Sequence, residues 1–182
     1  MYEFIAQAIG IAAMALNCLS YQNKNQKTVI AFQFFGSLLF SVNFLMLGAI
    51  SGCLLNLIGV IRAYVFVNKK KFNATHPLWL AAFTLAYILS YVFVFTLFDK
   101  EPSVKNFIIE VLPVIGMVLS TISFRYTDAK SIRAFGIFVS PLWLTYNIVN
   151  FALGGIICEA INMISIIIGM LRFDVKRNKA EL

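Results

Sequence analysis

Carboxamide side chains stand inside long apolar stretches of this sequence. Asn56 and Asn162 each lie near the middle of such a stretch, on a helical face that also carries glycine and other small residues. A carboxamide both donates and accepts hydrogen bonds, and its burial in lipid without partners costs several kcal/mol. We therefore expect both faces to turn inward, where they either line a cavity for a polar solute or bond one helix to another.

Four further side chains lie on such faces, at the spacing of three and four residues that defines one side of an α-helix. Trp143 and Asn147 occur together in one apolar stretch, and Phe40 and Asn43 occur together in another. With the two asparagines above, these four are the candidate solute-binding residues. For each of them the alternative is a contact between helices.

Two prolines and one glycine are candidate hinges. Pro113 and Pro141 stand inside predicted helices, where proline removes a backbone hydrogen bond and bends the helix. Gly10 matches Pro113 when the two halves of the chain are aligned, and it keeps that position flexible. These residues either serve a moving gate or shape the packing of the helices.

Two acidic residues lie inside the apolar stretches. Glu110 lies one turn into the fifth predicted helix and Glu159 one turn into the seventh, both near the outer surface of the membrane. Ionisable residues are rare in such segments and often mark ion or proton pathways. We expect either ordinary solvation at the interface or an outer mouth that attracts cations or takes up protons.

The composition of the chain is that of a membrane protein. Hydrophobic residues make up 60% of the chain, charged residues make up 13%, and the mean hydropathy is +0.85. A spanning helix needs about 17–25 mostly apolar residues. Seven segments qualify, so the sequence predicts an all-α membrane protein. The expected spans are 3–20, 29–47, 51–67, 78–98, 107–124, 134–153 and 156–171.

The positive charges indicate how these spans are oriented. Short loops rich in Lys and Arg stay in the cytoplasm. With seven alternating spans, thirteen of the fifteen cations fall on one side, and only Lys100 and Lys105 fall on the other. We therefore expect the N-terminus outside and the C-terminus in the cytoplasm. Because topology accounts for the net charge of +7, a nucleic-acid partner is not expected.

Residues that usually hold metals or cofactors are sparse. The three cysteines, Cys18, Cys53 and Cys158, lack CxxC spacing, and His76 has no ligand-like neighbours. No phosphate-binding GxxxxGK[ST] motif occurs, and no nucleophile clusters with a base and an orienting group. We expect no metal, no cofactor and no enzymatic activity.

One phrase of the sequence occurs twice. Residues 42–48 read VNFLMLG and residues 149–154 read VNFALG, and the same alignment places Asn56 over Asn162. Each half also has a basic loop after its first helix and a tight turn before its third, GAISG in one half and GG in the other. This agreement favours an internal repeat over chance similarity between apolar helices.

The repeat predicts how the chain is organised. An odd number of spans per repeat, joined by one linker span, gives both repeats the same orientation, as in some transporters. The expected parts are a first three-helix repeat at 1–68, a linker span with its loops at 69–105, a second three-helix repeat at 106–173 and a cytoplasmic basic tail at 174–182.

Three stretches resemble a known family, and together they extend over nearly the whole chain. They are Ala6-Gln7-Ala8-Ile9-Gly10, the stretch 110–116, and the stretch 151–173 with its Gly-Gly pair and its Leu-Arg-Phe end. All three look like the YgjV-type bacterial inner-membrane proteins. The resemblance implies a location in a bacterial inner membrane and assigns no substrate.

A more distant resemblance is to the SWEET, SemiSWEET and PQ-loop transporters. It rests on the three-one-three plan, on Ser20-Tyr21-Gln22 at the start of a loop, and on the mid-helix asparagines. In that group the third helix of each repeat supplies an asparagine to the pocket, which corresponds to Asn56 and Asn162. The resemblance also implies an aromatic contact at Trp143, with Phe40 as its approximate counterpart. The Pro-Gln pair of that group's loop motif is absent.

Together these features predict an inner-membrane protein that moves a small polar solute by alternating access between two three-helix bundles. The expected partners are the lipid bilayer and this solute, and association with further copies of the chain is left open. The competing hypothesis is a membrane scaffold that does not transport and whose partner docks on the basic cytoplasmic face.

Overall fold

Long helices make up the described part of the chain. The computed structural model describes residues 2–149 and 153–175, and it contains no strand within them. The long helices are α1 (Tyr2–Tyr21), α2 (Gln26–Met46), α3 (Ile50–Val67), α5 (Pro77–Thr96), α6 (Val104–Arg125), α7 (Ala129–Val149) and α8 (Leu153–Gly169). A short helix, α4 (Lys69–Phe72), lies between α3 and α5, and the π-helical turn η1 (Met170–Val175) continues α8.

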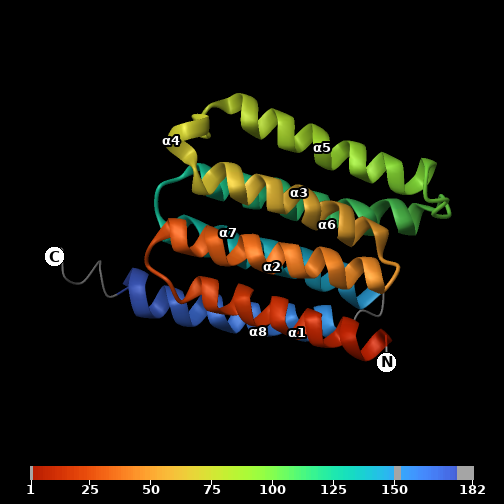
Figure 1. Cartoon of the computed structure of the whole chain (residues 1–182), viewed down its shortest axis with the longest axis horizontal. Helices are drawn as coiled ribbons and strands as arrows, with labels where there is room; N and C mark the ends of the chain where they lie inside the picture. The colour runs from red at the N-terminus through yellow and green to blue at the C-terminus, as the bar shows by residue number, and fades with distance from the viewer. Residues whose placement is uncertain (1, 150–152, 176–182) are drawn as a thin grey trace.

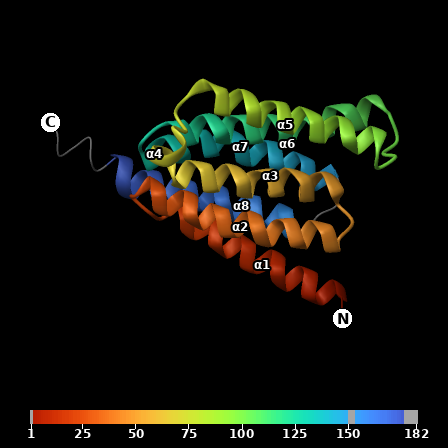
Figure 2. The same cartoon turned by 45° about the horizontal axis from the view of Figure 1, so that its top comes forward.

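The long helices form two layers of three with one helix outside them (Figure 1). In one layer α1, α2 and α3 pack in this order, and in the other α6, α7 and α8 do. The layers meet along two edges, where α1 packs on α8 and α3 packs on α6. The central helices α2 and α7 have few contacts with each other, and the turned view of Figure 2 shows them in separate layers. The internal repeat itself stays a prediction.

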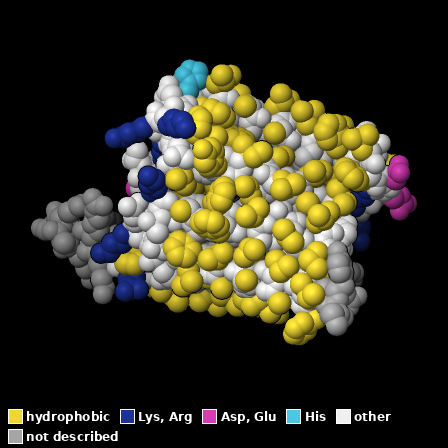
Figure 3. Space-filling view, viewed as in Figure 1, with side chains coloured by type: hydrophobic (Ala, Val, Ile, Leu, Met, Phe, Trp, Pro, Cys, Tyr) yellow, Lys and Arg dark blue, Asp and Glu magenta, His cyan; other side chains and the backbone are white. Residues whose placement is uncertain are grey.

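The surface separates apolar from charged side chains along the helix axes. Figure 3 shows apolar side chains over the body of the bundle, most of the visible Lys and Arg at one end, and Asp and Glu at the other. We call the first the basic end; it carries the α1–α2 connection, α4 and the α6–α7 connection. A soluble monomer rarely exposes so large an apolar patch.

Length and composition confirm the predicted fold class. Seven helices in the described part of the chain are long and apolar enough to cross a membrane. A helix rises about 1.5 Å per residue, so about 20 residues span the hydrocarbon layer of about 30 Å. The protein is therefore all-α with seven membrane-spanning helices, as the sequence predicted.

Aromatic packing holds α5 against the edge formed by α3 and α6. The ring of Phe83 stacks on those of Trp79 and Tyr87, with centroid distances of 5.9 and 6.5 Å. Phe66 of α3 contacts Phe124 of α6 with a centroid distance of 5.8 Å. Phe66, Phe83, Tyr87 and Phe124 are buried and belong to the hydrophobic core, so α5 contributes to this core from outside the two layers.

Most helix ends differ by a few residues from the sequence prediction, and the differences around α7 and α8 have a clear cause. The first helical residue of α7 is Ala129, five residues before the predicted start. Asp128 accounts for this, because its carboxylate accepts hydrogen bonds from the backbone N–H of Ser131 at 3.1 Å and from the hydroxyl of Ser131. The predicted tight turn at Gly154-Gly155 is wrong, since both glycines lie in the first turn of α8. The connection falls at 150–152, outside the described residues.

Asn43 bonds α1 to α2. Its Nδ2 donates to the backbone oxygen of Ala6 at 2.7 Å, in a buried position. Gly10 lies against the same amide, and a Cβ added there would stand 3.0 Å from Nδ2 of Asn43. The absence of a side chain at Gly10 therefore lets the two helices approach closely.

We predict that Asn43→Ala destabilises the protein by about 1 kcal/mol, because an interhelical hydrogen bond is lost in a site that water does not reach. Thermal unfolding in detergent measures the effect. The control is Asn106→Ala, whose amide donates to the Glu101 backbone oxygen in an exposed region where water can replace it. Equal losses in the two variants would contradict a role for Asn43 in joining the helices.

Candidate functional site

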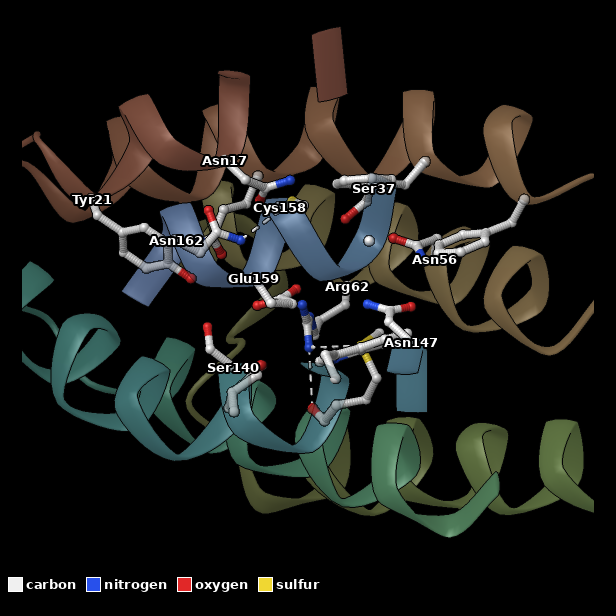
Figure 4. A pocket seen from close by; sticks show the side chains of 18 residues that line it. Asn17, Tyr21, Ser37, Asn56, Arg62, Ser140, Asn147, Cys158, Glu159 and Asn162 are labelled. Carbon is white, nitrogen blue, oxygen red and sulfur yellow. Dashed lines mark hydrogen bonds between the residues drawn. The ribbon is translucent and has the colours of Figure 1, made fainter. Parts of the chain in front are cut away.

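A cavity lies between the two layers, where α2 faces α7 (Figure 4). Side chains from α1, α2, α3, α6, α7 and α8 line it, and α5 contributes none. Its volume is about 100 Å³, somewhat less than the cavity of about 150 Å³ that binds benzene in an engineered protein core. Unlike that apolar cavity, which stays dry, this one has many polar groups in its wall.

Five of the six candidate solute-binding residues line this cavity. They are Phe40, Asn56, Trp143, Asn147 and Asn162. The sixth, Asn43, lies outside it, because its amide is used in the contact between α1 and α2. Asn43 therefore does not join the other five at the cavity, and its role in binding a solute stays a prediction. Its helical spacing resembles that of the others, but its side chain turns toward a neighbouring helix.

Two of the cavity asparagines keep an unused acceptor. Nδ2 of Asn56 donates to the backbone oxygen of Gly52 at 2.8 Å, and no hydrogen bond reaches its Oδ1 from the described residues. Asn147 is only 2% exposed, and its Oδ1 is buried without a partner. Gly155 of α8 packs on this amide so closely that a Cβ there would stand 2.5 Å from Cγ of Asn147. A buried orphan acceptor of this kind needs a water or a ligand to complete it.

Asn162 joins helices as well as lining the cavity. Its Oδ1 accepts from Sγ of Cys18 in α1 at 3.2 Å, and its Nδ2 donates to Sγ of Cys158 at 3.6 Å. Both thiols are free. The cavity and helix-contact hypotheses, which the sequence treated as alternatives, therefore both describe where Asn162 lies. Asn17, another lining residue, was not noticed in the sequence although it too is an amide inside an apolar stretch.

Glu159 places a carboxylate in the cavity wall. Ser140 of α7 and Asn162 are its hydrogen-bond partners, and both are neutral. Neither ion pair found among the described residues involves Glu159. The sequence placed this acid near the outer surface, whereas its side chain is directed into the interior of the bundle.

Glu110 has a different environment. It is 2% exposed and forms an ion pair with Nζ of Lys100, which lies in the α5–α6 loop at the end opposite the basic end. It does not line the cavity. The sequence treated both acids alike, either as solvated residues at the interface or as an outer mouth, and of the two only Glu159 faces the space between the layers.

Arg62 is a cavity residue that the sequence did not single out. It was counted with the loop cations, but it lies within α3, five residues before the end of that helix, and is 5% exposed. Its Nη1 donates to the Met117 backbone oxygen at 3.1 Å and to Oγ1 of Thr121 at 3.4 Å, while its Nε is buried without a partner. The guanidinium also lies 4.6 Å from the centre of the Phe124 ring.

The candidate hinges lie apart from the cavity. Pro113 in α6 and Pro141 in α7 do not line it, and both helices continue through the prolines. Gly10 lies in the α1–α2 contact described above. Their role in a moving gate stays a prediction.

Arg133 ties the two layers together at the basic end. It belongs to α7, is 2% exposed, and pairs with Asp174 of η1, with Nε to Oδ2 at 2.9 Å. Its Nη1 also donates to the backbone oxygens of Tyr21 and Asn23 at the end of α1, at 3.4 and 2.9 Å. This side chain was another of the cations that the sequence assigned to a loop.

A second polar cluster lies at the same end. Nε2 of Gln26 in α2 donates to the backbone oxygen of Tyr126 at 2.6 Å, and Nζ of Lys69 donates to Oε1 of Gln26 at 2.8 Å and to the same Tyr126 oxygen. Burial lowers the pKa of Lys69 to about 8, although Asp128 opposes the shift, so the ammonium is still mainly charged at pH 7. These contacts connect α2 and α4 to the α6–α7 turn.

Comparison with known proteins identifies the family. A family model described as a bacterial inner membrane protein, Imp-YgjV, matches residues 4–177. No curated protein and no solved structure matches the chain. The match extends over nearly the entire sequence and confirms the family resemblance, while the link to the SWEET and PQ-loop transporters stays a prediction. The chain belongs to the Imp-YgjV family of bacterial inner membrane proteins.

Proposed function

We propose that the protein carries a small polar solute across the bacterial inner membrane through the cavity between its two layers. The observation that carries this proposal is the incomplete hydrogen bonding of the cavity wall. Outside the cavity, buried polar side chains such as Asn43 and Arg133 bond to neighbouring helices. Of the three buried side-chain atoms without partners in the described part of the chain, two belong to cavity residues, Oδ1 of Asn147 and Nε of Arg62, and the third is Nε of Arg125. A solute or water that enters the cavity would supply partners for the first two.

The arrangement of the layers supports alternating access. The layers touch along the α1–α8 and α3–α6 edges, whereas α2 and α7 have few contacts across the cavity. Exchanging the first three helices for the last three leaves this contact order unchanged, as a twofold axis along the membrane normal would. A rocking motion of one layer against the other would then open the cavity to one side at a time.

Polar contacts between the layers supply the gates in this proposal. At the basic end, Arg133 and Gln26 each reach across to the other layer. At the opposite end, the side chain of Tyr146 in α7 lies beside that of Ser51 in α3. Opening at either end requires these contacts to break, and water at that end would replace them at modest cost.

The volume of the cavity also limits the size of the solute. Ligand pockets usually measure about 300–1,000 Å³, and the volume here is about 100 Å³. A solute of only a few non-hydrogen atoms fits this closed form. Asn56 and Asn147 would accept hydrogen bonds from it, and Phe40 and Trp143 would pack against its apolar part.

The basic end faces the cytoplasm in this proposal, since short basic loops are retained there. We predict that a reporter active only in the cytoplasm works when fused to the C-terminus, and that a reporter active only outside works at the N-terminus. Reporter activity in whole cells measures this. Both termini on the same side of the membrane would contradict seven spans with this orientation.

We predict that Asn56→Ala weakens transport without unfolding the protein. Loss of one hydrogen bond to the solute corresponds to about 0.5–1.5 kcal/mol, or a rise in KM of roughly 2- to 10-fold. Uptake into proteoliposomes is measured over a panel of amino acids, sugars, nucleosides and amines. The melting temperature of the empty protein should stay near that of the wild type, because the Asn56 amide bonds only to its own helix.

The control for this experiment is Asn68→Ala at the end of the same helix. Its amide also bonds to a carbonyl of its own helix, that of Tyr64 at 2.9 Å, but it lies outside the cavity. This variant should transport as the wild type does. If no solute in the panel enters the vesicles, the transport proposal is wrong and the scaffold hypothesis gains.

A further inference from the structure

Two opposite charges line the cavity from different layers. Arg62 comes from α3 in the first layer and Glu159 from α8 in the second, and both point into the space between them (Figure 4). No ion pair joins them to each other or to any other residue in the described part of the chain. Each charge is therefore held in the membrane interior by neutral partners alone.

Outside the cavity, the buried charges of the described chain form ion pairs. Arg133 is paired with Asp174, and Glu110 is paired with Lys100. A buried charge without a counter-ion is costly, and inside a membrane such residues pair with one another or face a water-filled path. Arg62 and Glu159 lack an ion-pair partner in the same cavity, which leaves both positions open to a charged group from outside the chain.

The geometry of Arg62 favours an anion with two oxygens. Nη1 is already used in bonds to Met117 and Thr121, so the edge formed by Nε and Nη2 has no hydrogen bond. This edge of a guanidinium binds a carboxylate through two parallel bonds. Arg62 cannot lose its proton at any ordinary pH, so only an anion can neutralise it.

Glu159 offers the complementary site. An ionised carboxylate has about four acceptor positions. Its partners Ser140 and Asn162 are single hydrogen-bond donors here, so positions remain for an ammonium group. The wall between the two charges carries Trp143 and Phe40, which suit the short carbon chain that would join a carboxylate to an amine.

We infer that the solute is a small zwitterion, such as a short amino acid, with its carboxylate on Arg62 and its ammonium on Glu159. The inference rests on the proposed transport function and names the substrate class of the same cavity. A zwitterion neutralises both charges and adds no net charge to the membrane interior. A sugar would leave both Arg62 and Glu159 without a counter-ion, and a singly charged solute would leave one of them without a counter-ion.

The same placement links binding to movement. Because the two charges belong to different layers, a solute that bridges them binds most tightly when the layers are close together. A ligand shifts a conformational equilibrium only by its different affinity for the two states. The affinity for a zwitterion held between α3 and α8 differs between the two states. When the layers separate, the zwitterion loses its contact with one of the two charged side chains.

The experiment measures ligand-induced thermal stabilisation of the purified full-length protein in detergent. The probes are glycine and β-alanine as zwitterions, propionate and methylamine as singly charged analogues, and glycerol as a neutral polar solute. We expect the dissociation constant of at least one zwitterion to be about tenfold or more below those of the other probes, because only a zwitterion satisfies both charges.

Three variants assign the two contacts. Glu159→Gln should weaken zwitterion binding about tenfold or more and should not weaken propionate binding, because a singly charged anion gains nothing from the Glu159 carboxylate. Arg62→Lys keeps the positive charge and the fold but loses the planar fork, so carboxylate binding should weaken. Glu110→Gln is the matched control, because it removes a buried acid outside the cavity, and it should leave zwitterion binding unchanged.

The outcomes separate this inference from the proposed function. If glycerol or a sugar binds and enters proteoliposomes while the zwitterions do not, the zwitterion inference is wrong and the transport proposal stands. The inference is also wrong if Glu159→Gln and Glu110→Gln bind zwitterions equally well. If no probe of any class stabilises the protein or enters the vesicles, both the inference and the transport proposal fall.

Discussion

The lack of water in the hydrocarbon layer is the constraint on which this structure depends. Every backbone polar group must be satisfied within the protein, and seven helices achieve this for the backbone. Side chains meet the same demand in two ways. Asn43 and Arg133 bond to neighbouring helices, whereas Asn147, Arg62 and Glu159 keep unused hydrogen-bonding capacity beside a cavity. In the proposed function, this second group is what distinguishes a path for a solute from a packed bundle.

The helix outside the two layers helps to set the geometry of this path. Tyr87 of α5 shares a hydrogen bond of 3.0 Å with Thr121 of α6, and Thr121 in turn accepts from Arg62 of α3. Phe124 lies against the guanidinium on another side. α5 contributes nothing to the cavity wall, but it fixes the side chain that supplies the positive charge there. A linker between two bundles can thus act as a support for the site.

The sequence predicted the spans well because their length and apolar composition are set by the membrane itself. It could not separate Asn43 from Asn56, since spacing gives the face of a helix but not which neighbour that face meets. Arg62 was missed because a cation near a helix end reads as part of a loop, although an isolated Arg inside an apolar run is a usable signal. The start of α7 was misplaced because Asp128 caps it through a bond that composition does not reveal. The unpaired state of Glu159 depends on contacts between helices that are distant in the sequence, so only the structure could reveal it.

The central claim is that the space between the layers is a water-filled path. Hydroxyl-radical footprinting of the unmodified protein in lipid nanodiscs tests this claim most directly. Radicals formed from water oxidise side chains that contact water, and mass spectrometry locates the products. The account predicts oxidation of Met117 and Trp143, which line the cavity, and little at Phe93, which is 41% exposed on the apolar surface that faces lipid. If Met117 and Trp143 are oxidised as little as Phe93, the interior is dry and packed, and the account is contradicted.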